Sequence, residues 1–275
     1  MEENTWTVTG PQVIDVDGVR SLKLGIVRGR FDIVTHDEDV ARIEVSEISG
    51  DPLSVSLVNG RLEVRHQLHG AQGWFKNLMG TVNNNSSNAV VISIALPAGV
   101  EVEAGTVSGD GMVSGISGHS RLSTVSGSVL ADGTSGELAV NTVSGEVIAR
   151  SHHGVLTAKS VSGEVTASGE FSNIRANTVS GDLSFDLQGF THDFGANSVS
   201  GDVTIRLPHD VGVDIVAKSA SGAVIIDDQK YHQPGGTVQT IAGPDRQLML
   251  VRTNSVSGKT SIFHGQPSAD SEQAR

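Results

Sequence analysis

The chain has 275 residues, of which 33 are glycine, 4% are aromatic and none is cysteine. Without cysteine it can form neither a disulfide framework nor a thiolate metal site. Its formal net charge of −12 opposes adsorption to an anionic membrane and argues against the basic stripe that a nucleic-acid interface requires.

The first part of the chain, residues 1–103, shows alternating apolar residues but no long repeat. This alternation predicts short strands over residues 13–16, 22–27, 33–35, 43–45 and 53–58. The Asn59-Gly60 pair predicts a tight turn into a further strand over 62–64. We expect this N-terminal β-hairpin region to extend the sheets that follow and to cap one end of them, because an uncovered end exposes strand edges.

A cluster of bulky apolar residues lies in a predicted loop over residues 70–88. Trp74, Phe75, Leu78 and Met79 stand together in the sequence GWFKNLMG, at spacing that one helical turn would place on one side. Aromatic and methionine side chains are typical of partner-binding surfaces. The cluster therefore predicts either a contact site for a partner protein or a lid over the open end of the core.

Residues 104–264 carry a repeat. The sequence TVSG, or a close variant, begins at Thr106, Thr124, Thr142, Ser160, Thr178, Ser198, Ser219 and Ser255. The first four intervals are 18 residues long, and weaker echoes such as Thr134-Ser135-Gly136 fall midway between the strong copies. Each 18-residue unit therefore holds two strands.

The constant unit length decides between a meander and a solenoid. In a parallel solenoid, coils stack about 4.8 Å apart, so a fixed coil length places identical residues above one another and favours their repetition. The sequence predicts an all-β fold, a parallel β-solenoid that is right-handed and β-helix-like. Residues 228–249 form an irregular insert in this array, and residues 265–275 are expected to be a disordered polar tail.

Alternation within a repeat predicts which side chains face the core. It places Val143, Gly145 and Val147 inward and Ser144 outward. A glycine that recurs on the inward side suits either two closely approaching sheets or a repeated bend. Asparagines that precede successive repeats predict a ladder of stacked side-chain amides, and these are Asn141, Asn177, Asn197 and Asn254.

The segment NAVVISIALPAGVEVEAGTVSGD at residues 88–110, followed by the TVSGEV and NTVSGDL units, resembles a family of bacterial β-strand-repeat proteins of unknown function. Members are known as toastrack domains or candidate adhesins, and the likeness extends over roughly residues 10–264. The resemblance implies an all-β repeat domain without established catalytic residues. It also implies a role in adhesion or in protein contacts linked to cell-envelope stress.

An acidic column is the strongest candidate for ion binding. Glu146, Glu164, Asp182 and Asp202 each follow the glycine of a repeat, so the solenoid stacks their carboxylates. Neighbouring carboxylates repel by about 1 kcal/mol per pair in water. The column is therefore either a solvated stripe or a weak cation site.

Histidine pairs provide no convincing metal site. His66 and His69 lack a third ligand, and so do His152 and His153, which a strand would point to opposite faces. The common hydrolase, dinucleotide and phosphate-loop motifs are also absent from the sequence. We therefore expect no catalytic residues, no cofactor and no metal.

These observations favour a non-enzymatic β-repeat scaffold or binding protein, adhesin-like, whose partner is another protein or a second copy of the chain. The first alternative is an adhesin module that binds a polysaccharide, and the second is a carbohydrate-active enzyme on a β-helix. The start of the sequence shows no signal peptide, and no transmembrane segment is visible. We expect a cytoplasmic protein, with surface exposure by an unrecognised route as the alternative.

Overall fold

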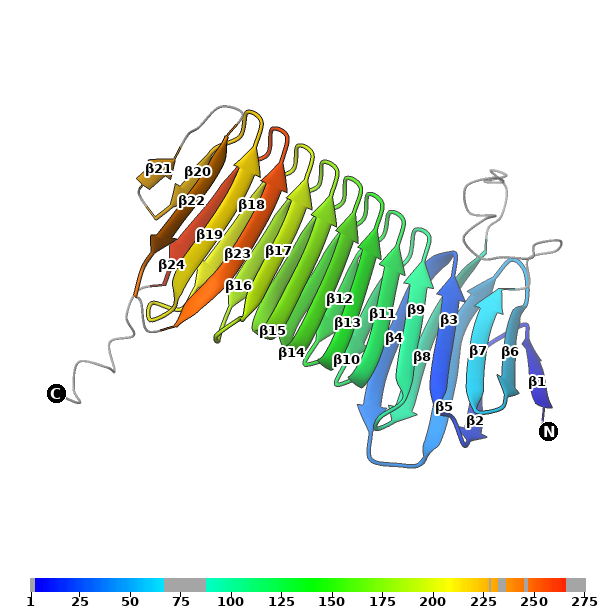
Figure 1. Ribbon diagram of the computed structural model, residues 1–275. Coiled ribbons are helices and arrows are strands. Elements are labelled where there is room, and N and C mark those ends of the chain that lie inside the picture. Colours follow the sequence, from blue (N-terminus) through cyan, green and yellow to red (C-terminus); the bar gives the residue numbers. More distant parts are fainter. Residues whose placement is uncertain (1–2, 67–87, 228, 232–235, 245–246, 266–275) are drawn as a thin grey trace.

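The computed structural model describes residues 3–66, 88–227, 229–231, 236–244 and 247–265. These residues form 24 strands and no helix. The strands wind into a flattened column of stacked coils with two walls (Figure 1). The predicted all-β parallel solenoid is confirmed, as is the extension and capping of its sheets by the N-terminal region.

Wall 1 is a continuous run of hydrogen-bonded strands from one end of the column to the other. In spatial order it contains β1 (Glu3–Val8), β6 (Leu53–Val58), β7 (Arg61–His66), β3 (Ser21–Ile26), β9 (Glu101–Thr106), β11 (Ser117–Thr124), β13 (Ser135–Thr142), the second halves of β14 (Val147–Ser160) and β15 (Val165–Thr178), β17 (Asp193–Ser198), β23 (Leu248–Ser255), β19 (Gly212–Ser219) and β22 (Thr237–Ala242).

Wall 2 lies opposite and has the same number of layers. Its spatial order is β2 (Gln12–Asp17), β5 (Val40–Ser49), β8 (Ala89–Pro97), β4 (Arg28–His36), β10 (Asp110–Ser114), β12 (Val129–Asp132), the first halves of β14 and β15, β16 (Leu183–Leu187), β18 (Val203–Leu207), β24 (Thr260–His264), β20 (Val224–Ile226) and β21 (Gln229–Tyr231).

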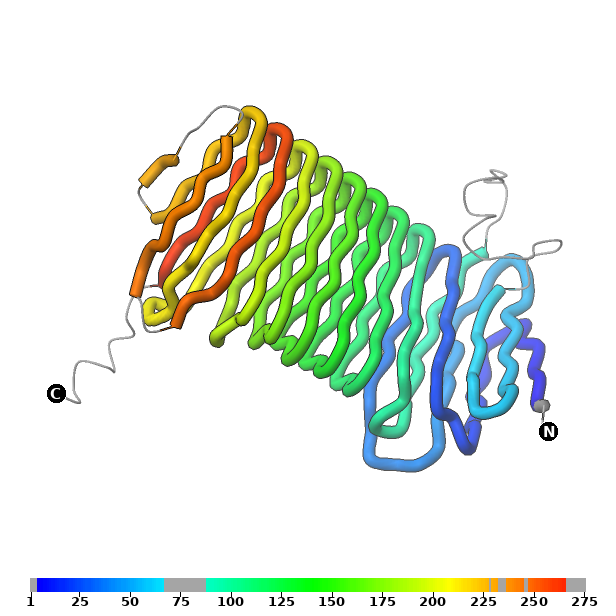
Figure 2. The backbone as a smooth tube through the Cα atoms, viewed as in Figure 1, coloured from blue at the N-terminus to red at the C-terminus, as the bar shows by residue number. Residues whose placement is uncertain are grey.

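Successive coils keep the register that the repeat predicts. Val129 of β12 pairs with Val147 of β14, and Val147 pairs with Val165 of β15, each 18 residues further along the chain. The tube in Figure 2 shows these coils running side by side along the column. Vertical register is thus a property of the main-chain ladders and repeats from coil to coil.

The core between the walls is narrow and consists mainly of aliphatic side chains. Columns of Val, Leu, Ile and Ala point inward from both walls and are almost fully buried. The ring of Phe31 occupies space beside a glycine, since a Cβ atom on Gly111 in the adjacent strand would overlap it. Phe185 and Phe194 pack edge to face across the core, with ring centroids 5.1 Å apart. The low aromatic content therefore follows from the limited space between the walls.

The corner from wall 1 to wall 2 differs from the predicted alternation. Thr142 is buried and Val143 is 40% exposed, so the prediction that Val143 faces inward was wrong, whereas Val147 is buried as predicted. The Thr142 hydroxyl donates a hydrogen bond to the carbonyl oxygen of Gly145, at 2.7 Å, and this closes a short turn. Within the turn two consecutive residues, Val143 and Ser144, point outward, which strict alternation cannot describe.

Glycine at this corner is required by the contact between coils. A Cβ atom on Gly163 would overlap the carbonyl oxygen of Gly145 in the preceding coil, and Gly145 stands in the same relation to Gly127. Of the two roles considered for this glycine, the structure shows the repeated bend. The close approach joins one coil to the next, and the opposite wall takes no part in it.

At the C-terminal end, spatial order departs from chain order. The coil of β23 and β24 inserts between the coil of β17 and β18 and the coil of β19 and β20. The repeats at Ser198 and Ser219 are therefore separated in space by the repeat at Ser255. The predicted insert over 228–249 contributes β21 and β22, which pair antiparallel to β20 and β19.

The N-terminal end uses the same arrangement in reverse. Along the column, the coil of β3 and β4 lies next to the coil of β7 and β8, on the side toward the repeats. The strands β5 and β6, which join these two coils in the sequence, pair antiparallel to β8 and β7. The predicted turn at Asn59 and Gly60 is present, with positive φ angles of 53° and 80°. Antiparallel strands thus close the parallel array at both ends.

Gly163→Ala tests the contact between coils. We expect this substitution to lower the free energy of unfolding by about 3 kcal/mol, because a methyl group would displace the neighbouring backbone. The matched control is Gly10→Ala, since a Cβ atom there has no neighbour within 4 Å. Urea denaturation of both variants measures the difference, and equal stabilities would contradict the proposed packing constraint.

Candidate interaction surface

A line of exposed valines runs along the corner between the two walls. We define the valine ridge as Val107, Val125, Val143, Val161, Val179, Val199 and Val256. The last five are between 40% and 53% exposed, and the first two are half-buried. The sequence contains this signal, because every valine lies between a hydroxyl residue and Ser-Gly, but the alternation rule assigns it to the core.

Main-chain hydrogen bonds between coils hold the ridge in line. The amide of Val143 donates to the carbonyl of Thr124, at 3.2 Å, and the amide of Ser144 donates to the carbonyl of Val125, at 2.8 Å. The Ser144 hydroxyl donates to the same Val125 carbonyl, at 3.1 Å. Since the corner amides are bonded along the stack, the ridge presents side chains and offers no unpaired β-ladder to a partner.

A shallow groove borders the ridge on the side of wall 1. Its volume is about 130 Å³, and its lining includes Val125, Val143 and Val161 together with Asn141 and Lys159. The buried hydroxyl residues of the turns, such as Thr124 and Thr142, also line it. The groove therefore adds a concave, mostly apolar strip beside the projecting valines.

The predicted asparagine ladder is present in the C-terminal half of the same face. Asn197 donates through Nδ2 to Oδ1 of Asn177, at 2.9 Å, and Asn254 donates through Nδ2 to Oδ1 of Asn197, at 2.8 Å. Asn141 donates instead to the Oγ of Ser123, at 3.5 Å. The amide ladder runs parallel to the valine ridge, because Asn177, Asn197 and Asn254 each lie two residues before a ridge valine.

The acidic column borders the ridge on the side of wall 2. Its aspartates are engaged by the main chain of the next coil: Asp182 accepts the amide of Asp202, at 2.8 Å, and Asp202 accepts the amide of Lys259, at 2.8 Å. The Lys259 ammonium lies 3.5 Å from the Asp202 carboxylate. By contrast, Glu146 and Glu164 are exposed and form no ion pair within the described part of the chain.

The structure brings the four predicted acidic residues into one column. In the described ranges, however, no three His, Asp or Glu side chains converge in a way that could hold a metal ion. Asp182 and Asp202 accept hydrogen bonds from the main chain of the next coil, and Glu146 and Glu164 extend into solvent. Cation binding by this column stays a prediction.

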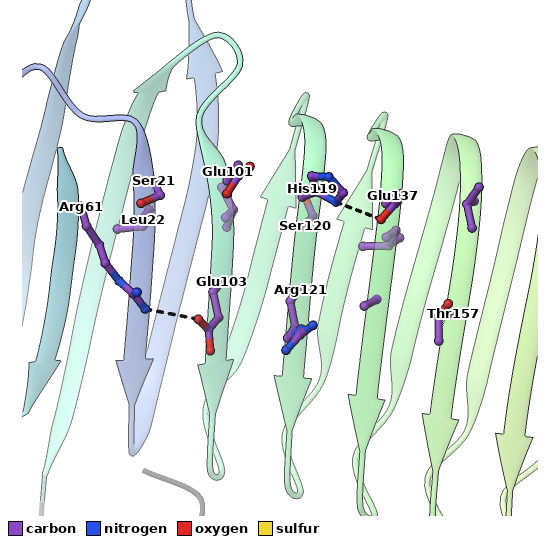
Figure 3. A pocket seen from close by; sticks show the side chains of 14 residues that line it. Ser21, Leu22, Arg61, Glu101, Glu103, His119, Ser120, Arg121, Glu137 and Thr157 are labelled. Carbon is purple, nitrogen blue, oxygen red and sulfur yellow. Dashed lines mark ion pairs between the residues drawn. The ribbon is translucent and has the colours of Figure 1, made fainter. Parts of the chain in front are cut away.

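Wall 1 carries a second hollow in its N-terminal half, which Figure 3 shows from close by. It has a volume of about 360 Å³. Glu103 lies 2.9 Å from Lys23 and 3.7 Å from Arg61, and His119 lies 3.0 Å from Glu137. No sequence pattern predicts this charged groove, because it joins β7, β3 and β9 from separate, non-repeating segments with the first repeat strands.

The charged groove does not provide a protected catalytic centre. A carboxyl group that acts as a general acid needs shielding from water, as a hydrophobic pocket provides. The side chains of Glu137 and His119 are each 65% exposed, and Glu103 is held by two cations. The arrangement is suited to binding polar groups across several strands.

One histidine of each predicted pair, His66 or His152, lies in the core. His152 is fully buried and His153 is exposed, as predicted for neighbours on one strand. The Nδ1 atom of His152 lies 2.9 Å from the Thr134 hydroxyl, and its ring packs 5.6 Å from that of Phe171. Burial lowers the pKa of His152 and also that of His66, which is 4% exposed. His69 lies outside the described residues.

The predicted partner contact formed by Trp74, Phe75, Leu78 and Met79 also lies outside the described residues, as does most of the 70–88 loop. The choice between a lid and a contact site therefore stays a prediction. The same holds for the expected tail, most of which lies beyond residue 265.

The fold defines a class: a parallel two-walled β-solenoid that is closed by antiparallel strands and carries ladders of identical side chains on its surface. A family profile described as Toastrack DUF4097 matches residues 23–262. The chain belongs to this family, which confirms the resemblance seen in the sequence. No protein with a curated description matches it in sequence.

Solved structures share the fold at low sequence identity. A candidate lipid-binding protein of Parabacteroides distasonis is 13% identical, with a TM-score of 0.54, and the alignment covers 94% of this chain and 97% of the other. A candidate adhesin of Parabacteroides merdae is 10% identical, with a TM-score of 0.50 and coverages of 96% and 97%. Within the described ranges, no helix has the length and apolar character to cross a lipid bilayer.

His152 predicts a pH-dependent stability. Its pKa lies below the ordinary value of 6.5 in the folded state, so the unfolded chain binds the proton first as the pH falls. The free energy of unfolding should therefore decrease below about pH 6.5, by at most about 1.4 kcal/mol per pH unit, until the folded-state pKa is reached. Urea denaturation between pH 7.5 and 5.5 should show a shallower decrease for His152→Gln than for the wild type. The exposed neighbour His153 provides the control. If the free energy of unfolding falls less steeply with pH in His153→Gln, and not in His152→Gln, the assignment to His152 is refuted.

Proposed function

We propose that this protein is a non-enzymatic, adhesin-like scaffold that binds a partner protein along the valine ridge. One observation carries the proposal: five valines that are 40–53% exposed stand in line on adjacent coils. Contiguous apolar surface of this kind marks interaction sites in soluble proteins. The shallow groove beside the ridge supplies concave surface for the same contact.

Folding alone does not require exposed valine side chains along the ridge. Threonine has a similar β-branched shape and strand propensity, and it would satisfy the same corner conformation while remaining hydrated. The chain has valine at this position in seven copies of the repeat, including the copy at Val256 that is displaced in chain order. A column of valines on seven successive coils is suited to a partner that extends along the column.

The length of the ridge fits a modest interface. Seven valines on successive coils span about 29 Å, at about 4.8 Å per coil. A contact of that length along one corner corresponds to the smaller class of protein interfaces, which are transient. The likeness in fold to a solved structure described as a candidate adhesin agrees with a binding role, and the exposed, unshielded carboxylates support the absence of catalysis.

A photoreactive residue tests the proposal. Benzoylphenylalanine in place of Val143 should give crosslinked adducts of defined mass when the producing cells are irradiated, because the partner lies against the ridge. The same residue in place of Val13, which is 57% exposed on β2, is the matched control. No adduct at position 143, or equal adducts at both positions, would refute the proposal.

Proteolysis of intact cells distinguishes the expected cytoplasmic location from surface exposure, because an added protease cleaves only protein that is exposed on the cell surface.

The charged groove of wall 1 favours a second candidate function, binding of a polysaccharide. Arg61, His119 and Arg121 project from neighbouring strands with Glu103 and Glu137, so donors and acceptors alternate across the groove (Figure 3). Sugar hydroxyl groups can use both kinds of partner.

An Arg121→Ala variant tests this second candidate. Calorimetric titration with a panel of envelope oligosaccharides should detect at least one ligand, and the substitution should weaken its binding about tenfold, because a charged hydrogen bond is lost. Arg252→Ala, on the same wall but outside the groove, is the control. Failure of the whole panel to bind would exclude this candidate.

A further inference from the structure

We propose that the occupant of the valine ridge is a basic, amphipathic α-helix of a partner protein. The inference rests on the proposed function, in which the ridge is a binding surface. It is supported by the hydrogen bonding of the corner, the dimensions of the ridge and the charges beside it.

The main chain of the corner favours a helix over an added strand. Strand addition requires a sheet edge with free amide and carbonyl groups. At the ridge these groups are bonded between coils, as in the pairs from Val143 to Thr124, from Ser144 to Val125 and from Gly145 to Val125. A helix satisfies its own main chain and needs only side-chain contacts from the surface that receives it.

The dimensions fit an ordinary helix. The ridge of about 29 Å corresponds to about 19 residues of α-helix, at 1.5 Å per residue. Aliphatic side chains along one face of such a helix would enter the groove that Val125, Val143 and Val161 form with Asn141 and Lys159. The projecting valines would then pack against the same apolar face.

The charges beside the ridge indicate that the bound helix is positively charged. Glu146 and Glu164 lie three residues after Val143 and Val161, immediately before the strands of wall 2 begin, and they are exposed and without an ion pair in the described part of the chain. Lysine and arginine on the flank of the helix would compensate these carboxylates. The charge of −12 opposes a second copy of the chain and an anionic membrane as occupants.

A designed peptide provides the probe. A peptide of about 18 residues, with leucine along one helical face and lysine on the other, is labelled with a fluorophore and titrated with the full-length protein. Fluorescence anisotropy should show saturable binding that weakens as salt rises from about 0.05 to about 0.5 M. A peptide of the same composition in scrambled order should bind at least tenfold more weakly, and so should a peptide with glutamate in place of lysine.

Paired variants locate the binding. Val143→Thr/Val161→Thr keeps the branched shape and should weaken binding about tenfold, because two aliphatic contacts are lost. Its control is Val13→Thr/Val58→Thr, since these valines are also exposed but lie on the end strands β2 and β6. Glu146→Gln/Glu164→Gln should weaken binding and reduce the salt dependence, whereas Glu44→Gln/Glu47→Gln on β5, with the same change in net charge, should not.

The outcomes separate this inference from the proposed function. Equal binding of the ordered and scrambled peptides, or no effect of the ridge variants, overturns the basic helix. If crosslinks from position 143 still form, the proposed function stands with another kind of partner. A dimer in sedimentation that Val143→Thr/Val161→Thr dissociates would assign the ridge to a second copy, and ridge-dependent binding to phosphatidylcholine vesicles would assign it to lipid; either result overturns the inference.

Discussion

The coil-to-coil hydrogen-bond ladder is the constraint on which the rest of the structure depends. Neighbouring coils are bonded in fixed register, and at the corner their main chains approach so closely that only glycine fits, as at Gly145 and Gly163. A buried hydroxyl, such as that of Thr142, closes each turn from inside. Because every coil meets the same neighbours, one local solution is selected at each copy. The core between the walls is narrow, and the ring of Phe31 occupies space that Gly111 leaves in the adjacent coil.

A hydrogen-bond ladder of this kind leaves strand edges at its two ends, and both ends are closed in the same way. At each end the last parallel coil in space is separated from its neighbouring repeat by a displaced coil, and the strands that join these two coils in the sequence pair antiparallel to the last parallel coil. Antiparallel strands and the displaced coil tie the terminal layers to the interior of the array. The arrangement converts a parallel stack, which otherwise invites further chains to add, into a particle of fixed length.

The same repetition shapes the surface. A residue that points outward from one coil points outward from all of them, so the corner carries parallel stripes of asparagine, valine, serine and acidic side chains. Asparagine and serine stabilise their own stripes through hydrogen bonds between coils. The ridge valines form no side-chain hydrogen bonds between coils, and Glu146 and Glu164 have no ion pair in the described residues. This difference distinguishes the stripes that stabilise the fold from those available to a partner.

The sequence by itself determined the all-β class, the 18-residue coil, the vertical register and the asparagine ladder, because each follows from local periodicity. It also determined the turn at Asn59 and Gly60. Three features were decided only by the tertiary structure. The outward direction of Val143 depends on the turn that Thr142 and Gly145 close, and alternation along a strand does not extend through a turn. The position of the repeat at Ser255 between those at Ser198 and Ser219, and the groove that joins Arg61 to Glu103 and His119, depend on strands distant in the chain. Periodicity describes contacts between neighbouring repeats. The displaced repeat and the charged groove depend instead on contacts between strands that are distant in the chain and that meet near the ends of the column.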